Sequence, residues 1–203
     1  MKTLDYLKEL PQEEVFPLLC QILPQLELED MLEQAGALAA AIPELAPTIG
    51  FDQRSPHHSY DLYTHIAHVV AKVPKDVTLR WAALLHDVGK IPTFTQDETG
   101  RGHFYGHAPE SARMADAILR RLGAPEEMRN RVTFLIGSHM IKLGPDRQTL
   151  RGQVASMGWE AMEQLIDLRE ADMGSKGKEK SGDPGVFCDL RSMMAELREE
   201  MAG

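Results

Sequence analysis

The side chains best suited to chemistry in this sequence are its histidines, which gather in one part of the chain. All eight lie between positions 57 and 139 of a chain of 203 residues. Imidazole changes its charge near neutral pH and is a frequent metal ligand, so the cluster points toward a catalytic or metal-binding centre. The eight residues are His57, His58, His65, His68, His86, His103, His107 and His139.

His65 lies within a stretch whose apolar residues recur at helical spacing from Leu62 to Val73. This spacing predicts a helix over 61–73, with His65 at the edge of the apolar face and His68 pointing away from it. A lone histidine on such a face is more often a satisfied core residue than a metal ligand. Its interpretation therefore depends on whether other polar residues also face the interior.

His86 and Asp87 stand near the end of a second predicted helix, over 76–89, which is apolar on nearly every side. Such a helix belongs at the centre of a domain. Because an unpaired buried carboxylate is costly, this pair needs a partner that satisfies it. A metal ion is one candidate partner. Capping of Asp87 by backbone N–H groups, or its pairing with an arginine, is the alternative.

Two further polar residues lie on apolar helical faces. His139 falls on the buried stripe of a helix predicted over 125–141, and Asp172 falls among leucine and alanine residues of a helix predicted over 154–173. An ion pair between Asp172 and Arg169 is the competing explanation for the second. Polar groups on four inward faces are hard to explain as core filling. Nitrogen and oxygen donors without a thiolate favour a catalytic site for Fe, Mn, Co, Ni or Zn over a structural zinc site.

The elements that carry these residues read as helices, and we predict an all-α fold. Aromatic residues make up only 6% of the chain while Met and Ala are plentiful, which favours a helical core over a β-sandwich. No segment alternates convincingly between polar and apolar residues. The stretch 92–107 reads as a loop, and Gly123 separates two helices whose first turns contain Pro109 and Pro125.

The net charge of −9 is concentrated near the amino terminus. Residues 1–50 hold two basic and nine acidic side chains and carry −7, whereas residues 51–203 carry −2. Broad nucleic-acid binding needs several lysines or arginines that face phosphates, so we expect such binding to be weak or absent. A small phosphate pocket remains compatible with this balance.

The sequence predicts a cytoplasmic protein without a membrane partner. Asp5 and Glu9 interrupt the apolar stretch that a secretory signal needs, and no run of about 18 apolar residues occurs. Cys20 and Cys188 match neither a disulfide framework nor a CxxC pair.

The polar residues described above occur in an order that resembles the H…HD…D pattern of the HD superfamily of metal-dependent phosphohydrolases. Longer segments sharpen the resemblance, which covers about 40–175. They closely resemble the HD domain of bacterial tRNA nucleotidyltransferases, the CCA-adding enzymes. The resemblance implies a helical bundle with a metal site between its central helices. The segments are QRSPHHSYDLYTH (53–65), LLHDVGKIPTFTQDETGRGHFYGHAPESA (84–112) and LREADM (168–173).

The resemblance also implies roles for individual residues. Asp87 and Lys90 are the expected catalytic residues, with Lys90 facing a substrate phosphate. One or two divalent cations are implied, with Fe, Mn, Ni, Co, Zn or Mg as candidates. The first ion would be held by His65, His86, Asp87 and Asp172, and the second by Asp87, His107 and His139. The substrate-binding candidates are Lys90, His103, Arg54, His57 and His58, for most of which hydrogen bonding within loops is the alternative.

The sequence departs from the CCA-adding enzymes at its amino terminus. Those enzymes carry a nucleotidyltransferase head with a glycine-rich turn and paired carboxylates, and residues 1–50 lack that motif. We therefore expect no nucleotide addition, and the chain reads as a stand-alone HD protein or a module of a longer one. The expected regions are acidic helices packing on the core (1–50), an HD core (51–175), and a flexible loop with a C-terminal helix (176–203).

Three functions fit these residues. The first is a metal-dependent phosphohydrolase acting on a small phosphorylated substrate such as a nucleotide, as a 2′,3′-cyclic phosphodiesterase, nucleotidase or phosphatase. A divalent cation would activate water and polarise a phosphoryl oxygen, while Lys90 offsets the developing charge. The second is a non-catalytic HD module for nucleotide or tRNA binding or for oligomerisation, for example as a homo-oligomer. The third is a nucleoside triphosphate or diadenosine-polyphosphate hydrolase with the same ligands. The complete ligand set beside Lys90 favours an enzyme.

Overall fold

The computed structural model describes residues 4–55, 59–144, 146–177 and 185–202, which are mostly helical, and it confirms the all-α fold class. The α-helices are α1 (Gln12–Ile22), α2 (Leu28–Glu33), α3 (Ala35–Ala41), α4 (Leu62–Lys72), α5 (Val77–Leu85), α6 (Lys90–Thr93), α7 (His107–Arg121), α8 (Glu126–Ser138), α9 (Arg147–Met157), α10 (Trp159–Met173) and α11 (Gly185–Ala202). The other described elements are the 3-10 helices Asp5–Glu9, Leu23–Gln25 and Pro43–Thr48 and the strands β1 (Thr95–Gln96) and β2 (Gly102–His103).

Helices α4 and α5 begin at aspartate caps. The side chain of Asp61 accepts a hydrogen bond from the Thr64 N–H, and that of Asp76 accepts one from the Leu79 N–H, each at 2.9 Å. These bonds satisfy backbone donors that have no partner within the first turn of a helix. Helix α4 therefore has the position that the apolar spacing over 61–73 predicts.

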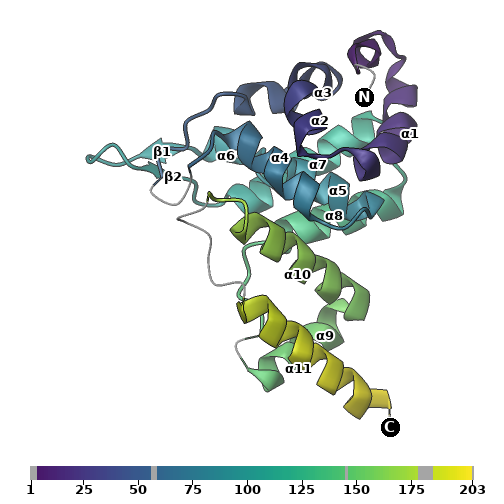
Figure 1. Ribbon diagram of the computed structural model, residues 1–203, viewed down its shortest axis with the longest axis vertical. Helices are drawn as coiled ribbons and strands as arrows, with labels where there is room; N and C mark the ends of the chain where they lie inside the picture. The colour runs from purple at the N-terminus through teal and green to yellow at the C-terminus, as the bar shows by residue number, and fades with distance from the viewer. Residues whose placement is uncertain (1–3, 56–58, 145, 178–184, 203) are drawn as a thin grey trace.

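Helix α5 lies at the centre of the main bundle, and its side chains from Leu79 to Leu85 are all buried. Helices α4 and α8 pack against it, and α7 packs along α8. The amino-terminal helices also pack on α4 and α5 (Figure 1). There the Tyr63 hydroxyl of α4 donates to the Met31 carbonyl at 2.8 Å. The acidic first part of the chain thus packs directly on the central helices.

A second apolar core lies between α9, α10 and α11. Figure 1 shows α9 and α11 below the main bundle with α10 between them and that bundle. Helix α10 also packs on α4, α5 and α8, so it belongs to both cores. Residues 178–184 of the expected loop lie outside the described residues. The second core is made by Leu150, Val154, Met162, Ile166, Phe187, Leu190, Met194 and Leu197.

The helix predicted over 154–173 is wrong in its extent. Two helices, α9 and α10, cover this region, and Gly158 separates them with a φ angle of 84°. A residue with a side chain rarely adopts this angle, so the glycine permits the chain to turn between the helices. Helix α9 begins earlier than predicted, after a cap at Asp146, whose side chain accepts from the Thr149 N–H at 2.8 Å.

The helix predicted over 76–89 is also too long, because α5 ends at Leu85. The Nδ1 atom of His86 lies 2.8 Å from the Ala83 carbonyl, which a continuing helix would offer to the N–H of Asp87. The chain then turns through bonds from Val88 to Leu85 and from Lys90 to Asp87. His86 and Asp87 consequently lie at the end of a buried helix.

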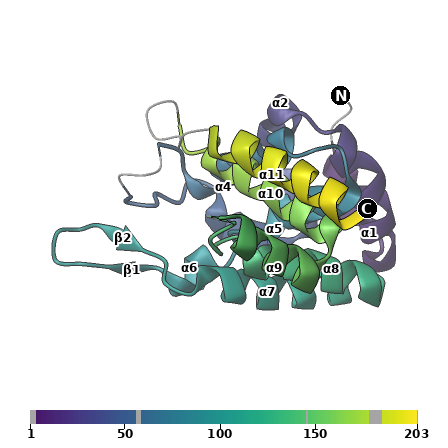
Figure 2. The same ribbon diagram turned by 90° about the horizontal axis from the view of Figure 1, so that it is seen from below.

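The loop predicted over 92–107 contains a short antiparallel hairpin. Thr95 pairs with His103 and Gln96 pairs with Gly102. The hairpin projects from the helical bundle beyond α6 (Figure 2). Its strands are too short for polar and apolar alternation to reveal them in the sequence. Among the described residues, none of the helices has both the length and the apolar composition that a membrane span requires.

Candidate metal centre

Five helices bring the candidate ligands together. His65 comes from the middle of α4, while His86 and Asp87 follow the end of α5. His107 begins α7 and His139 follows the end of α8. Asp172 lies in the last turn of α10. The structure therefore places together all the ligand candidates, although they are spread over more than half of the sequence.

The carboxylate of Asp87 lies at the middle of this cluster. Its Oδ2 atom is 3.3 Å from His65 Nε2 and 3.2 Å from His86 Nε2. Its Oδ1 atom faces the other way, 3.4 Å from His107 Nε2 and 3.9 Å from His139 Nε2. Each oxygen thus faces one pair of histidines.

Asp172 completes the first of these two groups. Its Oδ1 atom lies 3.2 Å from His65 Nε2, and its Oδ2 atom lies 3.9 Å from the ammonium of Lys176. The Arg169 guanidinium instead donates a hydrogen bond to the Ile141 carbonyl. In this arrangement Asp172 faces the histidine cluster, which favours the ligand interpretation over an ion pair with Arg169.

All four histidines of the cluster are held in the same tautomer. The Nδ1 atom of each donates to a backbone carbonyl, so when the ring is neutral its lone pair is on Nε2 and is directed at the cluster. In three cases the carbonyl belongs to the residue three positions earlier. The pairs are His65 with Ser175 (3.1 Å), His86 with Ala83 (2.8 Å), His107 with Phe104 (2.8 Å) and His139 with Ile136 (2.6 Å).

These tautomers create a demand for positive charge. His107 Nε2 and His139 Nε2 lie 3.4 Å apart, so in the neutral rings two lone pairs face each other. His86 Nε2 is buried and has no hydrogen-bond partner among the described residues. Buried polar atoms in native proteins are nearly always satisfied. A divalent cation bound by nitrogen and oxygen donors fits both groups. Among the residues that the structure describes, the donor atoms lie close enough to hold a metal ion in two groups, which are His65, His86 and Asp87, and Asp87, His107 and His139.

The electrostatics of the cluster keep its carboxylates charged. Burial alone would raise the pKa of Asp87, but His86 and Lys90 together hold it well below its ordinary value. Burial lowers the pKa of His139 to about 4, with a further contribution from His86. For His65 burial acts in the same direction, but the carboxylates of Asp172 and Asp87 outweigh it and raise the pKa.

The cluster opens into a cavity of about 250 Å³ whose wall carries several cations. The ammonium of Lys90 lies 2.7 Å from Asp87 Oδ2 and donates to Gln53 Oε1 at 2.9 Å. Lys90 is only 5% exposed. Arg101 and Lys176 also line the cavity. Lysine and arginine thus line this opening although the net charge of the chain is −9.

Of the remaining substrate-binding candidates that the structure describes, one lines the cavity and one does not. His103 lines the cavity and lies 2.8 Å from Asp97 Oδ2. Arg54 is exposed and is not among the residues lining the cavity, but its backbone carbonyl accepts a hydrogen bond from Gly102 of β2. His57 and His58 lie outside the described residues.

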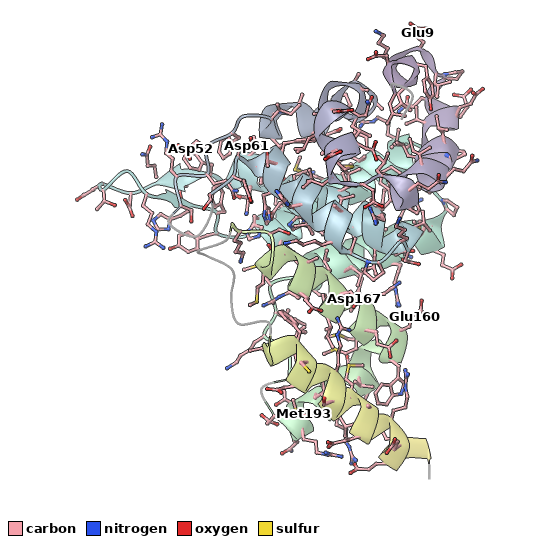
Figure 3. All side chains as sticks on the ribbon, viewed as in Figure 1. Glu9, Asp52, Asp61, Glu160, Asp167 and Met193 are labelled. Atoms are coloured by element: carbon pink, nitrogen blue, oxygen red, sulfur yellow. The ribbon has the colours of Figure 1, made fainter. Side chains whose placement is uncertain are left out.

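Arg54 has a φ angle of 46°, and its N–H donates to the Asp52 side chain at 2.8 Å. Figure 3 shows Asp52 and Asp61 at the end of the bundle from which the hairpin projects.

Several polar residues of the site were not found from the sequence, among them Arg101, Lys176, Gln53 and Ser175. Lys176 follows Asp172 by one helical turn, a spacing that could have revealed it. Gln53 is buried and donates to the Tyr60 carbonyl at 3.3 Å while it accepts from Lys90. Ser175 supplies only its backbone carbonyl to His65, so its side chain gives no signal.

Residues 57–172 match the family model of the HD domain. The chain is 34% identical over 180 residues to the A-adding tRNA nucleotidyltransferase of Deinococcus radiodurans, which covers 84% of this chain and 41% of that protein. It is 34% identical over 158 residues to the CC-adding tRNA nucleotidyltransferase of Thermus thermophilus, covering 74% of this chain and 36% of the relative.

A multifunctional CCA protein of Aromatoleum aromaticum is 36% identical over 115 residues, which are 55% of this chain and 28% of that protein. The chain belongs to the HD domain family, and the resemblance to the HD regions of tRNA nucleotidyltransferases is confirmed. It spans less than half the length of each of these relatives.

Proposed function

We propose that this protein is a metal-dependent phosphohydrolase that hydrolyses phosphoester bonds of nucleotides or related small substrates. The observation that carries the proposal is the placement of Asp87 between two pairs of histidine Nε2 atoms, with Lys90 beside it. HD domains form a family with metal-dependent phosphohydrolase chemistry, and the donors here fit divalent cations.

In this proposal the residues divide into two ligand sets that share Asp87. The first ion would be held by His65, His86, Asp87 and Asp172, and the second by Asp87, His107 and His139. Fe, Mn, Ni, Co, Zn and Mg are the candidate metals. Divalent cations bound by these residues would supply activation of water and polarisation of a phosphoryl oxygen. The carbonyl-bound Nδ1 atoms fix each imidazole, so the protein's own ligands need no rearrangement.

Lys90 has a separate role, which is to bind the phosphoryl group. Its ammonium is held in place by Asp87 and Gln53 and lies 5.3 Å from the centre of the Phe104 ring. A buried, fixed positive charge stabilises negative charge that develops on phosphoryl oxygens during hydrolysis. Arg101 and Lys176 attract the anionic substrate to the opening.

The proposal is tested by hydrolysis of bis-para-nitrophenyl phosphate and 2′,3′-cyclic AMP with added Mn²⁺, Ni²⁺ or Mg²⁺. His65→Gln removes a proposed ligand, and His68→Gln, on the same helix, is the matched control, since His68 stacks on Tyr60 outside the cluster. We expect His65→Gln to lose turnover and His68→Gln to retain it. Absence of hydrolysis by the unaltered protein with every metal and substrate would contradict the proposal.

A second candidate function is a non-catalytic module that binds nucleotides or tRNA. The relatives favour it, because they are tRNA nucleotidyltransferases.

A third candidate function is hydrolysis of nucleoside triphosphates or diadenosine polyphosphates with the same ligands. The cavity of about 250 Å³ is smaller than most pockets for drug-sized ligands, which favours a substrate no larger than a mononucleotide. We also propose action in the cytoplasm, because Cys20 and Cys188 are free thiols.

A further inference from the structure

The most exposed of the large apolar side chains in the described part of the molecule lies at the mouth of the cavity. Tyr105 is 80% exposed, yet it lines the same cavity as Asp87 and Lys90. An exposed aromatic side chain is ordinary when it stands alone on a surface. Tyr105, however, lies beside a cationic opening and two residues before the candidate ligand His107, which makes it a candidate for ligand binding.

The ring of Tyr105 stacks on a neighbouring side chain. The imidazole of His103 stacks on it, with ring centres 5.4 Å apart and an angle of 7° between the ring planes. His103 is in turn held by Asp97, whose Oδ2 atom lies 2.8 Å from its Nε2. The other oxygen of Asp97 accepts from Thr99 and from the Arg101 N–H. The hairpin therefore presents a two-ring stack in which each member has a fixed partner.

The backbone on both sides of Tyr105 is also anchored. The preceding Phe104 packs with Phe94 and Phe51, at ring-centre distances of 5.6 and 6.4 Å. The following Gly106 has a φ angle of 78° and leads directly into α7. Because His107 starts that helix, the backbone of Tyr105 is held beside the candidate metal centre.

We propose that Tyr105, supported by His103, is a stacking subsite for the base of a nucleoside phosphate; this inference rests on the proposed function. The small cavity has room for a phosphoryl group and sugar beside Lys90, while an attached base stays at its mouth. Exposed aromatic rings bind bases by stacking, with little preference among them. A mononucleotide and the 3′ end of an RNA offer the same chemistry.

The test is binding, which does not require turnover. The dissociation constants of AMP and ribose 5-phosphate, which differ by the base, are measured by calorimetry on the metal-loaded protein, with both ligands supplied as phosphonate analogues that resist hydrolysis. We expect the unaltered protein to prefer AMP. Tyr105→Ala weakens AMP binding by about 5- to 150-fold and leaves ribose 5-phosphate binding unchanged. Tyr105→Phe keeps the ring and retains the preference. A 3′-phosphorylated trinucleotide that binds more tightly than AMP identifies an RNA end as the source.

Equal binding of AMP and ribose 5-phosphate by the unaltered protein would overturn the inference. An equal loss for both ligands in Tyr105→Ala would overturn it too, because it would indicate disturbance of His107 rather than lost stacking. Because Tyr105 is so exposed, its replacement leaves the core intact. Failure of the proposed function is a separate result, namely base-dependent AMP binding without hydrolysis of any phosphoester.

Discussion

Among single residues, Lys90 is the one whose positive charge we expect to contribute most directly to hydrolysis. It is buried against Asp87 and Gln53 and over the ring of Phe104. Lys90→Met keeps most of the side-chain volume but removes the ammonium. We expect kcat to fall by about 10²- to 10³-fold, the loss typical when a fixed group that stabilises developing negative charge is removed. Steady-state kinetics with 2′,3′-cyclic AMP measures it.

The control is Lys75→Met. Lys75 is exposed and pairs with Glu27 on the surface, an ion pair of the kind that contributes about 0–1 kcal/mol to stability. Its loss should change neither kcat nor KM. Equal activity of Lys90→Met and Lys75→Met would show that the Lys90 ammonium has no part in hydrolysis.

The sequence revealed ligand candidates wherever a polar residue interrupts an apolar helical face. His65, His139 and Asp172 stand out for this reason, and the structure brings them together with Asp87. Gln53 could not be found this way, because it lies outside any helix and its role depends on the distant Lys90. The tautomers of the histidines could not be predicted either, since backbone carbonyls set them.

At the scale of elements, the approach of α6 to α7 depends on Gly89. A Cβ atom at this position would lie 2.4 Å from the Ser111 backbone nitrogen and 2.6 Å from the His107 carbonyl oxygen. Gly89→Ala therefore forces the start of α7 away. We expect a loss of about 1–3 kcal/mol in the free energy of unfolding, the usual cost of overpacking. Chemical denaturation measures this loss.

Gly137→Ala in α8 is the matched control. There the nearest atom to a new Cβ is that of Ala112 at 3.6 Å, an ordinary contact. Alanine is the better helix former, so this variant should be as stable as the original or gain up to about 1 kcal/mol. If Gly89→Ala were equally stable, the close packing at the start of α7 would not be present in solution.

The positions of helices were more predictable than their ends. The apolar spacing and the caps at Asp61 and Asp76 locate α4 and the start of α5. The end of α5 depends on a bond from the His86 ring to the Ala83 carbonyl, which is a matter of side-chain geometry. The break at Gly158 was missed because a single glycine also occurs inside helices.

At the scale of the whole molecule, Arg80 joins the acidic amino-terminal helices to the central bundle. Its buried guanidinium donates to the Leu26 carbonyl at 2.8 Å and to the Pro74 carbonyl at 3.3 Å. Arg80→Met leaves these carbonyls without their donor. We expect a loss of about 1–3 kcal/mol in the free energy of unfolding, measured by urea denaturation.

The control is Arg151→Met, which breaks a surface ion pair with Glu200 and should lower the free energy of unfolding by less than about 1 kcal/mol. An equal loss of stability in both variants would mean that Arg80 does not join the amino-terminal helices to the central bundle.

The metal content of the purified protein and of two variants, measured by mass spectrometry, shows directly whether this cluster binds two cations. Because Asp87 faces both pairs of histidines, we expect about two equivalents of divalent metal in the unaltered protein and close to none in Asp87→Ala. His107→Ala should keep about one equivalent, in the group formed by His65, His86, Asp87 and Asp172. Unchanged metal content in Asp87→Ala, or no metal in the unaltered protein after incubation with Mn²⁺ or Ni²⁺, would contradict the account.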